Sequence, residues 1–478
     1  MPLLMKRFFA AVIAISLVAF FPYDLKAEGS PAPAKPNILF IIVDDLGKDW
    51  VSCYGADDIQ TPHIDALAKG GMKFQNAYSM GSCSQSRATL LTGKYPFRTG
   101  WVGHWDVPRW GVGYFDWKKK ENTTFARLMK DLGYATCAAG KWQINDFRLE
   151  PLALNKHGFD DWAMWTGFET GNPPSDKRYK DPYINTPEEG SQTYAGKFGP
   201  DIYTDRLIQF MRAHKDEPMC LYYPMPLLHA PFVATPVEPN VTSRLDRHKA
   251  MVRYVDKMVG QLVAELDKLG IRERTIIFIA SDNGTDAKIT GSLNGKESKG
   301  AKGQHTEPGI CGPFIVNGPG IVPAGVETDA LTDLSDILPT FVELGGGKVP
   351  DDLVVDGKSL APLILGKETD SKRDWILAMS DRATLDEKGI RPLKDFGPRV
   401  IRDKRYKAWV NSNKKVERLH DLQKDPGEVT NLVQSDLAED KEALQKFMAV
   451  VGTFPEKDAR MLYEPRAKNA WDRELNKS

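Results

Sequence analysis

Two apolar runs of strand length, far apart in the sequence, each end in oxygen-bearing side chains. The runs span residues 37–43 and 275–280. The polar residues that follow them are Asp44 and Asp45, and Asp282 and Asn283. Continuous apolar runs are typical of strands buried in a parallel sheet, and open α/β sheets bind ligands at the carboxyl ends of their strands. We therefore expect a cation site there, because carboxylate and amide oxygens suit a hard cation.

Other apolar runs alternate with helical patterns along the chain. Strands are predicted at 134–139, 219–223 and 313–316, and helices at about 123–132, at 243–269 and at 333–344. This alternation predicts an α/β fold, with a mostly parallel mixed sheet flanked by helices. Residues 169–200 are polar and rich in Gly, Pro and Asp, and they predict a long surface insertion of the kind that shapes substrate choice.

A smaller C-terminal subdomain is predicted after a polar stretch near 364–374. Its expected elements are short strands at 375–379, 399–402 and 406–410 and a helical stretch at about 436–450. We therefore divide the chain into a catalytic domain, 37–365, and a C-terminal subdomain, 372–478.

Residues 1–27 have the features of an export signal. Lys6 and Arg7 precede an apolar stretch, Phe8–Phe21, that is too short to span a membrane comfortably. Residues 28–36 are rich in Pro and Ala and predict an extended linker. We expect a protein that is exported to the periplasm or secreted, without membrane association after signal cleavage; a retained N-terminal anchor is the alternative.

Charge and cysteine content narrow the class of protein further. The 64 basic and 64 acidic residues give a net charge of zero, so nothing favours a nucleic-acid partner. A hydrophobic content of 41% is ample for a large core. The five cysteines have neither CxxC nor zinc-site spacing, and between zero and two disulfides are compatible with them.

Cys83 stands at the start of a short amphipathic run, and Arg87 follows one helical turn later. At a helix N-terminus, free backbone N–H groups and the helix dipole favour negative charge. Arg87 at i+4 lies on the same face and can contact an oxyanion. A buried structural cysteine is an equally good reading of this short pattern alone.

The longer pattern Cys83-x-x-Ser-Arg87-x-x-x-Leu-Thr-Gly93 resembles the signature of the type I, formylglycine-dependent sulfatases of the alkaline-phosphatase superfamily. Further stretches resemble this family in the same order. They are Thr61–Gly70, Gly140-Lys141-Trp142, His229-Ala-Pro231, Lys302–Gly309 and Asp333–Leu344. The resemblance covers roughly residues 37–432, and it implies an alkaline-phosphatase-like fold whose C-terminal part is a small antiparallel sheet with a packed helix.

The resemblance also implies a chemistry for these residues. Cys83 would be oxidised to Cα-formylglycine, whose hydrate attacks sulfur, and Ca²⁺ would be held by Asp44, Asp45, residue 83, Asp282 and Asn283. Arg87, Lys141 and Lys302 would neutralise the sulfuryl oxygens, and His229 would protonate or hydrogen-bond the leaving oxygen. The implied activity is hydrolysis of a sulfuric ester.

Three positions depart from the family pattern. Gln85 replaces the usual Pro or Ala of the signature, Pro308 replaces a Gly, and Gln143 replaces a His that is a natural base beside the formylglycine. Conversion of Cys83 therefore requires a maturase that accepts Gln85. The candidate replacement bases are His305 and His104, since both lie on loops next to site motifs, and a metal-bound carboxylate is the further alternative.

Aromatic residues crowd the segment 94–117, and flat aromatic faces suit sugar rings, although core packing is their commoner use. We therefore expect a sulfated carbohydrate or a small organic sulfate as substrate. The expected substrate-binding residues are Gln143, His104, Trp105 and His305. Two alternatives remain open: a formylglycine-dependent phosphodiesterase or phosphonate monoester hydrolase, and a non-catalytic sulfated-glycan binder in which Cys83 is never converted.

Overall fold

The computed structural model describes residues 35–103, 116–148, 150–167, 172–380, 383–386, 389–392 and 394–460. The predicted signal peptide, most of the predicted linker, His104 and Trp105 lie outside these ranges. From Lys35 onward the chain forms one compact unit.

A ten-stranded mixed sheet has the order β12-β2-β11-β8-β1-β7-β3-β4-β5-β6. Its strands are β1 Asn37–Val43, β2 Met72–Tyr78, β3 Ala135–Lys141, β4 Asp161–Trp165, β5 Tyr183–Thr186, β6 Gly190–Thr193, β7 Met219–Met225, β8 Thr275–Ser281, β11 Phe314–Asn317 and β12 Val326–Asp333. The five central strands β8, β1, β7, β3 and β4 are mutually parallel. Strands β11, β5 and β6 run antiparallel to their neighbours.

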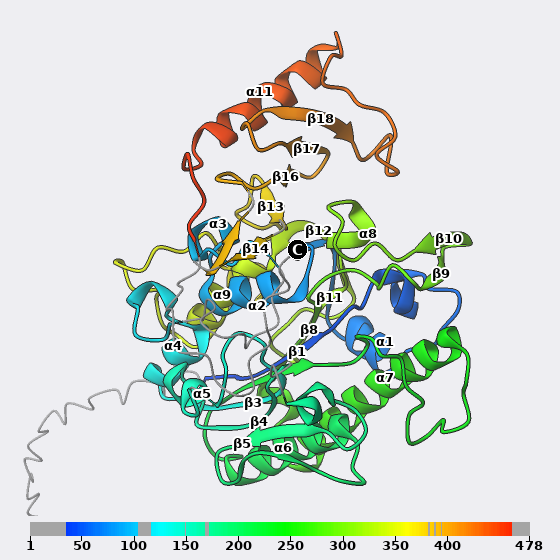
Figure 1. The fold of residues 1–478 in the computed structure, drawn as a ribbon, viewed down its shortest axis with the longest axis vertical. Helices are drawn as coiled ribbons and strands as arrows, with labels where there is room; N and C mark the ends of the chain where they lie inside the picture. Colours follow the sequence, from blue (N-terminus) through cyan, green and yellow to red (C-terminus); the bar gives the residue numbers. More distant parts are fainter. Residues whose placement is uncertain are drawn as a thin grey trace, which may run out of the picture. The chain divides into compact units, whose positions relative to one another are not determined.

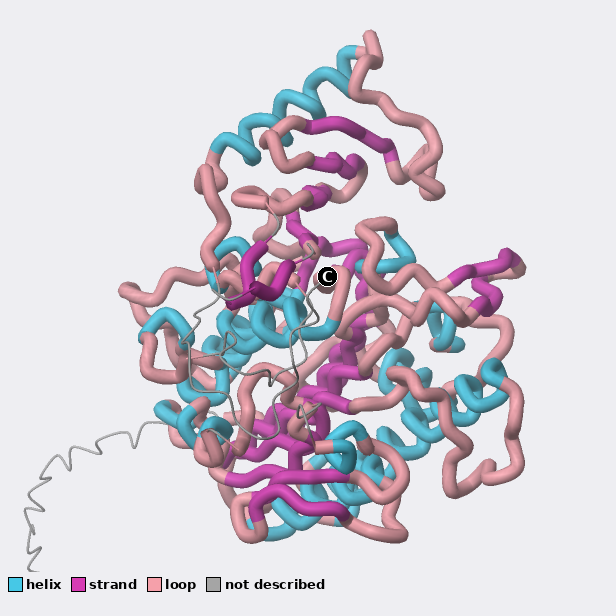
Figure 2. The backbone as a smooth tube through the Cα atoms, in the orientation of Figure 1, coloured by secondary structure: helices cyan, strands magenta, loops and turns pink. Residues whose placement is uncertain are grey.

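The helices are α1 Pro62–Lys69, α2 Cys83–Thr92, α3 Pro96–Thr99, α4 Phe125–Asp131, α5 Ala153–Lys156, α6 Gly199–Ala213, α7 Arg244–Lys268, α8 Glu307–Ile310, α9 Ile337–Leu344, α10 Ala361–Ile364 and α11 Ala438–Gly452. Helices α1, α6 and α7 cover one face of the sheet, and α2, α4 and α9 cover the other (Figure 1). Figure 2 shows the strands running between these two groups of helices.

Strand β1 explains why the sheet needs helices on both faces. Ile38, Phe40 and Ile42 pack into the core under α2, α4 and α9, whereas Leu39 and Ile41 pack into the core under α1, α6 and α7. Every residue of β1 is buried, as the continuous apolar run predicts. The predicted α/β fold with a mostly parallel sheet is confirmed.

The predicted antiparallel C-terminal sheet is also confirmed. It has the order β13-β16-β17-β18, with β13 Ile376–Met379, β16 Arg399–Arg402, β17 Tyr406–Val410 and β18 Val416–Asp421. Phe447 and Val451 of α11 pack on this sheet, in a core that also includes Tyr95 and Phe97 from the segment after α2. Those two aromatic residues are therefore core residues. The predicted boundary at 365–372 falls between α10 and β13.

Two hairpins complete the described elements: β9 Thr290–Leu293 with β10 Lys296–Lys299, and β14 Ala383–Asp386 with β15 Gly389–Pro392. The described part of the polar segment, residues 172–200, is not simply a surface insertion, because it supplies β5 and β6 at one edge of the main sheet. All five cysteines lie in the described ranges, and none of them forms a disulfide there.

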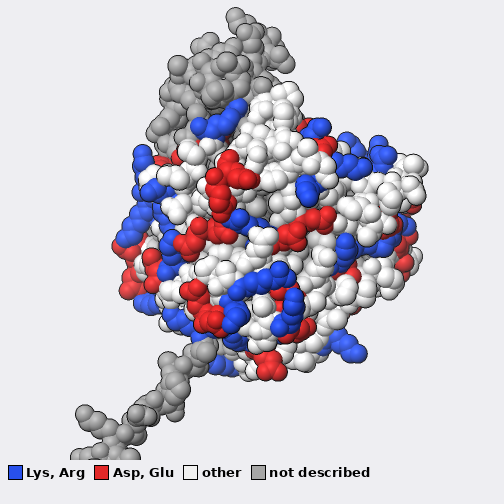
Figure 3. Space-filling model, turned by 90° about the horizontal axis from the view of Figure 1, so that it is seen from below, with Lys and Arg blue, Asp and Glu red and all other residues white. Residues whose placement is uncertain are grey.

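Surface charge is mixed on the face shown in Figure 3, where acidic and basic side chains lie in small neighbouring groups. Over the described residues, none of the helices combines the length and the apolar character that crossing a membrane requires.

Candidate active site

Strands β1 and β8 bring the predicted cation ligands together. The two strands are parallel neighbours in which Val43 pairs with Ser281, so the residues that follow each strand meet at one edge of the sheet. The Asp282 amide donates to the Val43 carbonyl at 3.3 Å, and the Asp45 amide donates to Asp282 Oδ1 at 3.2 Å. Asn283 Nδ2 donates to Asp45 Oδ1 at 2.7 Å. The expected proximity of these side chains follows from this register.

Several oxygens of this group lack a protein donor. Among the described residues, the buried side-chain oxygens here without a hydrogen-bond partner are Asp44 Oδ1, Asp45 Oδ2 and Asn283 Oδ1. Ligand atoms of Asp44, Cys83 and Asp282 lie within 4.8 Å of one another. Buried oxygens without donors are expensive unless a cation or water meets them. The donor set is rich in carboxylate oxygen, and it therefore fits a Ca²⁺ ion.

The pKa shifts of the three carboxyl groups also support a cation site. Burial raises the pKa of Asp45 to about 6, despite the opposing effect of Lys302. Burial and the neighbouring Asp44 carboxylate raise the pKa of Asp282 well above its usual value. For Asp44, Lys141 and other nearby cations outweigh burial and hold the pKa well below its usual value. Three adjacent buried carboxylates repel one another, and a divalent cation would relieve that repulsion.

Helix α2 carries Cys83 at its first turn, after Ser82 as the N-cap residue. Ser86 fixes the helix to the strand ends: its hydroxyl donates to the Asp282 carbonyl and accepts from the Met80 amide at 3.1 Å. Arg87 then faces the carboxylates, donating to Asp282 Oδ2 at 2.8 Å and to the Lys141 carbonyl at 3.0 Å. Every residue of α2 is buried, so the position of Cys83 is fixed by packing.

Two lysines complete the charged group. Lys141, the last residue of β3, donates to Asp44 Oδ2 at 2.5 Å and to Cys83 Sγ at 3.4 Å. Lys302 lies 2.6 Å from Asp45 Oδ1. Burial alone would lower the pKa of Lys302, but the Asp45 carboxylate raises it above its ordinary value. These cations surround residue 83, where an anionic ester would have to bind.

His229 lies on the loop after β7, and one of its ring nitrogens is within 4.8 Å of carboxylate oxygens of Asp44 and Asp45. The loop is tied to the site by backbone hydrogen bonds, from Asp44 N to Leu227 O at 2.9 Å and from Leu228 N to Asp44 O at 2.6 Å. Burial, and then the nearby Lys141 and Lys302, lower the pKa of His229 well below its usual value.

The remaining predicted residues have different surroundings. Gln143 is buried two residues beyond Lys141, with a left-handed φ of 70°. His305 packs against Trp409 of the C-terminal sheet, with ring centroids 5.9 Å apart, and its Nε2 has no hydrogen-bond partner within the described ranges. Burial, with Lys407, lowers the pKa of His305 to about 4. His104 and Trp105 lie outside the described residues.

Sequence reasoning missed Arg178 and Trp165. The Arg178 guanidinium lies 3.1 Å from His229 Nδ1 and 4.3 Å from the centroid of the Trp165 ring. A single Arg within a polar segment gives no sequence signal of this kind. Only the antiparallel pairing of β5 with β4, which folds the segment back onto the sheet, brings Arg178 to the site.

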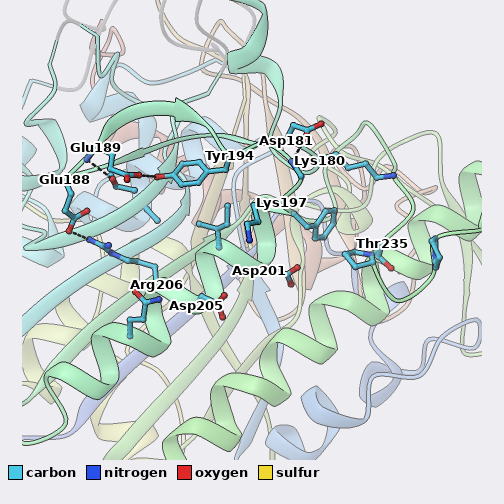
Figure 4. Close-up of a pocket in the computed structure, with 18 residues that line it drawn as sticks. Lys180, Asp181, Glu188, Glu189, Tyr194, Lys197, Asp201, Asp205, Arg206 and Thr235 are labelled. Carbon is cyan, nitrogen blue, oxygen red and sulfur yellow. Dashed lines mark hydrogen bonds and ion pairs between the residues drawn. The ribbon is translucent and has the colours of Figure 1, made fainter.

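A cavity of about 1080 Å³ among the described residues lies elsewhere. It is lined by residues of α6, by the segments that flank β6 and by the loop around Thr235, and Figure 4 shows Arg206 paired with Glu188, at 2.7 Å, and Tyr194 with Glu189. None of the described site residues lines it. The chemistry is therefore expected at the carboxyl ends of the strands and not in this cavity.

Comparison with known proteins agrees with this geometry. The sulfatase family model matches residues 36–347, and a model for the C-terminal region of N-sulphoglucosamine sulphohydrolase matches residues 302–450. The N-acetylgalactosamine-6-sulfatase of Canis lupus familiaris is 31% identical over 369 residues, which cover 72% of this chain and 68% of that protein. The steryl-sulfatase of Rattus norvegicus is 29% identical over 436 residues, covering 72% and 73% of the two chains.

Among solved structures, the crystal structure of Ps i-CgsB in complex with k-i-k-neocarrahexaose superimposes with a TM-score of 0.72 and 26% identity, covering 90% of this chain and 95% of that chain. The fold, the two family matches and the identity to curated sulfatases all agree. The chain belongs to the type I sulfatase family and is a sulfuric ester hydrolase.

Proposed function

We propose that the enzyme removes sulfate from a sulfated carbohydrate, with Cys83 converted to formylglycine and Ca²⁺ bound beside it. The observation that carries the proposal is the position of Cys83 at the first turn of α2, among Asp44, Asp282 and Lys141. A nucleophile there would meet both the cation site and the cationic side chains that an anionic ester requires.

The residues that would hold Ca²⁺ are Asp44, Asp45, Asp282 and Asn283, with residue 83 as a further ligand. When bound, the ion would lower the pKa of the attacking hydroxyl and offset the negative charge of the sulfate. The donor oxygens without protein partners support this assignment.

Arg87, Lys141 and Lys302 would bind the sulfuryl oxygens. In the structure they pair with Asp282, Asp44 and Asp45, so they are already held in fixed orientations before a substrate arrives. Preorganised cations of this kind stabilise charge that develops in a transition state without reorganising. His229 lies on the same edge of the sheet, and the negative charge of a bound sulfate ester would favour protonation of its other ring nitrogen, Nε2, from which it would hydrogen-bond or protonate the leaving oxygen.

The preference for a carbohydrate rests on two observations. The dog relative is named for a sulfated amino sugar, and the Ps i-CgsB structure contains a neocarrahexaose. The steryl-sulfatase relative makes a steroid sulfate the second candidate. We further propose export to the periplasm or outside of the cell, on the basis of residues 1–27.

Mass spectrometry of the peptide that carries Cys83, from protein made in its native host, tests the proposal. We expect a mass loss that corresponds to conversion of the thiol to the aldehyde. An intact thiol in all molecules would contradict the catalytic assignment and would favour the sulfated-glycan binder. Gln85 is buried and donates to Ser380 and to the Val102 carbonyl, each at 3.2 Å, so a maturase must act before this packing forms.

Parallel assays distinguish the sulfatase from the phosphodiesterase alternative. Sulfate and phosphate esters of the same alcohol, such as 4-nitrophenol, should be compared with the converted enzyme. We expect faster turnover of the sulfate ester, and a preference for the phosphate diester would favour the phosphodiesterase.

A further inference from the structure

Arg178 is a buried cation that has no counter-ion among the described residues. Arg178 is 7% exposed and lies between the short helix Pro173–Asp176 and β5. Within the described ranges, no Asp or Glu oxygen lies within 4.0 Å of its guanidinium, and its buried Nε has no hydrogen-bond partner. A buried charge is normally paired, because desolvation is otherwise uncompensated.

The other buried arginines follow that rule. Arg87 meets Asp282 at 2.8 Å, Arg399 meets Asp458 at 2.6 Å, and Arg402 meets Glu307 at 3.1 Å. Each of these three buried guanidinium groups is therefore paired with a carboxylate, and Arg178 is the exception among the buried arginines that the structure describes.

The contact with His229 does not replace a counter-ion. His229 Nδ1 lies 2.7 Å from the Ala230 carbonyl and 3.1 Å from Arg178 Nη1. A carbonyl only accepts and a guanidinium only donates, so one ring nitrogen cannot hydrogen-bond to both at once. The shorter contact indicates that the Nδ1–H of His229 donates to the Ala230 carbonyl, and Arg178 then has no acceptor among the described residues.

The surroundings of Arg178 connect it to the sulfate site. Its guanidinium lies over the Trp165 ring at 4.3 Å, and Lys141 Nζ lies 6.0 Å from the centroid of the same ring. Arg178 also contacts His229, the residue that would meet the leaving oxygen. Arg178 is therefore on the side of the site where the alcohol part of a sulfate ester would lie.

We propose that Arg178, held by Trp165, forms a subsite for a second oxyanion, a carboxylate or a further sulfate, on the alcohol part of the substrate. The planar guanidinium is suited to such a group because it can donate two parallel N–H groups to it. The proposal rests on the proposed function, and it narrows the substrate class to sulfate esters that carry a second negative charge. Specificity would come from the uncompensated charge, which a neutral alcohol leaves unpaired.

Binding to the Cys83→Ala variant tests the subsite without turnover. The probes are 3- and 4-carboxyphenyl sulfate and the corresponding neutral carboxamides, titrated calorimetrically in the presence of Ca²⁺. We expect at least one carboxylate isomer to bind about tenfold or more tightly than its carboxamide, as charge-assisted hydrogen bonds imply. Adding Arg178→Met should abolish this preference, and Arg178→Lys should retain part of it.

Lys177→Met is the matched control, because it removes an exposed cation one residue away. It should leave the preference unchanged. The subsite is refuted if the Cys83→Ala variant binds carboxylate and carboxamide equally well. It is also refuted if the carboxylate preference persists after Arg178→Met is added. Thermal unfolding of each variant shows whether a loss of binding reflects a loss of folding, and Arg178→Lys provides the folded comparison.

Turnover by the converted enzyme separates this inference from the proposed function. If Arg178 binds a second anion, Arg178→Met should lower kcat/KM more for the carboxylate ester than for its carboxamide. An equal loss of kcat for both esters would instead make Arg178 a positioning residue for His229 and would overturn the subsite. If the fully converted wild type hydrolyses no sulfate ester while the binding preference persists, the proposed function fails and the anion subsite stands.

Discussion

Asp45 is the second residue after β1 and has a left-handed φ of 64°. One of its carboxylate oxygens accepts from Asn283 and Lys302, and the other has no partner among the described residues. Asn adopts this backbone conformation more readily than Ala and keeps the shape of Asp. Asp45→Asn therefore removes the charge with little strain, and it tests the cation site better than Asp45→Ala.

We expect Asp45→Asn to bind Ca²⁺ more weakly and to lose roughly a hundredfold or more in turnover, since even groups that only support a metal ligand contribute ten- to a hundredfold. Calcium titration of chelator-treated protein, together with sulfate-ester hydrolysis, measures both effects. Asp216→Ala, which removes an exposed carboxylate paired with Lys215, is the control. Full wild-type activity after exhaustive chelation would show that no metal is needed.

Gln143 occupies the position where the family resemblance implies a histidine base. A neutral amide can hydrogen-bond to a hydroxyl but cannot take its proton at neutral pH, and loss of a general base costs on the order of 10²–10⁴ in the step it serves. His305 does not compensate in the structure, because its ring packs on Trp409 and makes no hydrogen bond to residue 83. We therefore expect the step after departure of the alcohol to be slow.

Rapid-mixing experiments with 4-nitrophenyl sulfate should show a burst of 4-nitrophenol in the wild type and a smaller burst in Gln143→His. Gln209→His, on the exposed side of α6, controls for the added imidazole. Linear product release from the first turnover, in both the wild type and Gln143→His, would mean that another group accepts the proton.

At the scale of the secondary-structure elements, α7 contains a buried histidine that does not serve the site. His248 is fully buried against Trp50 and Phe232, with ring centroids 4.5 and 5.4 Å away, and neither ring nitrogen has a hydrogen-bond partner among the described residues. Burial, with a small effect of Lys249, lowers its pKa from 6.5 to about 3. The folded protein therefore holds this imidazole neutral.

Below pH 6.5 the unfolded chain takes up a proton at His248 that the folded chain does not, so stability is lost as the pH falls from 6.5 towards 3. Each pKa unit corresponds to about 1.4 kcal/mol, which gives roughly 2 kcal/mol at pH 5. His248→Leu should remove this dependence, and urea unfolding of both proteins at pH 7.5 and pH 5 would measure it. Equal losses of stability on acidification would refute the assignment.

The elements also show how far the sequence could predict the structure. Strands β1 and β8 were predictable because full burial on both faces makes their sequences continuously apolar. Strand β12 was not, because it is an edge strand that alternates exposed Glu327 and Asp329 with buried residues. Helix α6 was missed because it begins within a Gly- and Pro-rich polar segment.

The site also contains residues that the sequence could predict and residues that it could not. The residues after β1, β3, β7 and β8 were predictable because polar groups at strand ends gather at one edge of a parallel sheet. The role that we propose for Arg178 was not predictable, because it depends on the lack of a described acidic side chain close to it in the folded chain. The surroundings of His305 depend on Trp409, which is more than a hundred residues away in the sequence.

At the scale of the whole molecule, the C-terminal sheet contacts the segment that carries Lys302. Glu307, five residues after Lys302, accepts hydrogen bonds from Tyr78 at 2.7 Å, from Arg402 at 3.1 Å and from Lys407 at 3.1 Å. Arg402 and Lys407 belong to β16 and β17, so a buried ionic group joins the two predicted domains directly behind the site.

Glu428 closes this ionic group from the loop after β18. Its carboxylate accepts from the Glu307 amide at 2.9 Å, from Lys407 at 2.9 Å and from Trp409 Nε1 at 3.0 Å. Its backbone is left-handed, with φ of 56°. Glycine adopts that conformation without a steric penalty, so Glu428→Gly removes the carboxylate and leaves the backbone unstrained.

We expect Glu428→Gly to lower kcat for 4-nitrophenyl sulfate about ten- to a hundredfold. The loss of a buried acceptor frees the start of α8, and a displacement of Lys302 by about 1 Å is enough for an effect of this size. Glu439→Ala, which removes an exposed carboxylate of the same subdomain that pairs with Lys424 and Arg405, should keep the wild-type rate. Calcium binding should persist in both variants, since the strands that carry the cation ligands are untouched. A Glu428→Gly enzyme that is destabilised to heat yet turns over at the Glu439→Ala rate would show that the C-terminal sheet supports the fold and does not position Lys302.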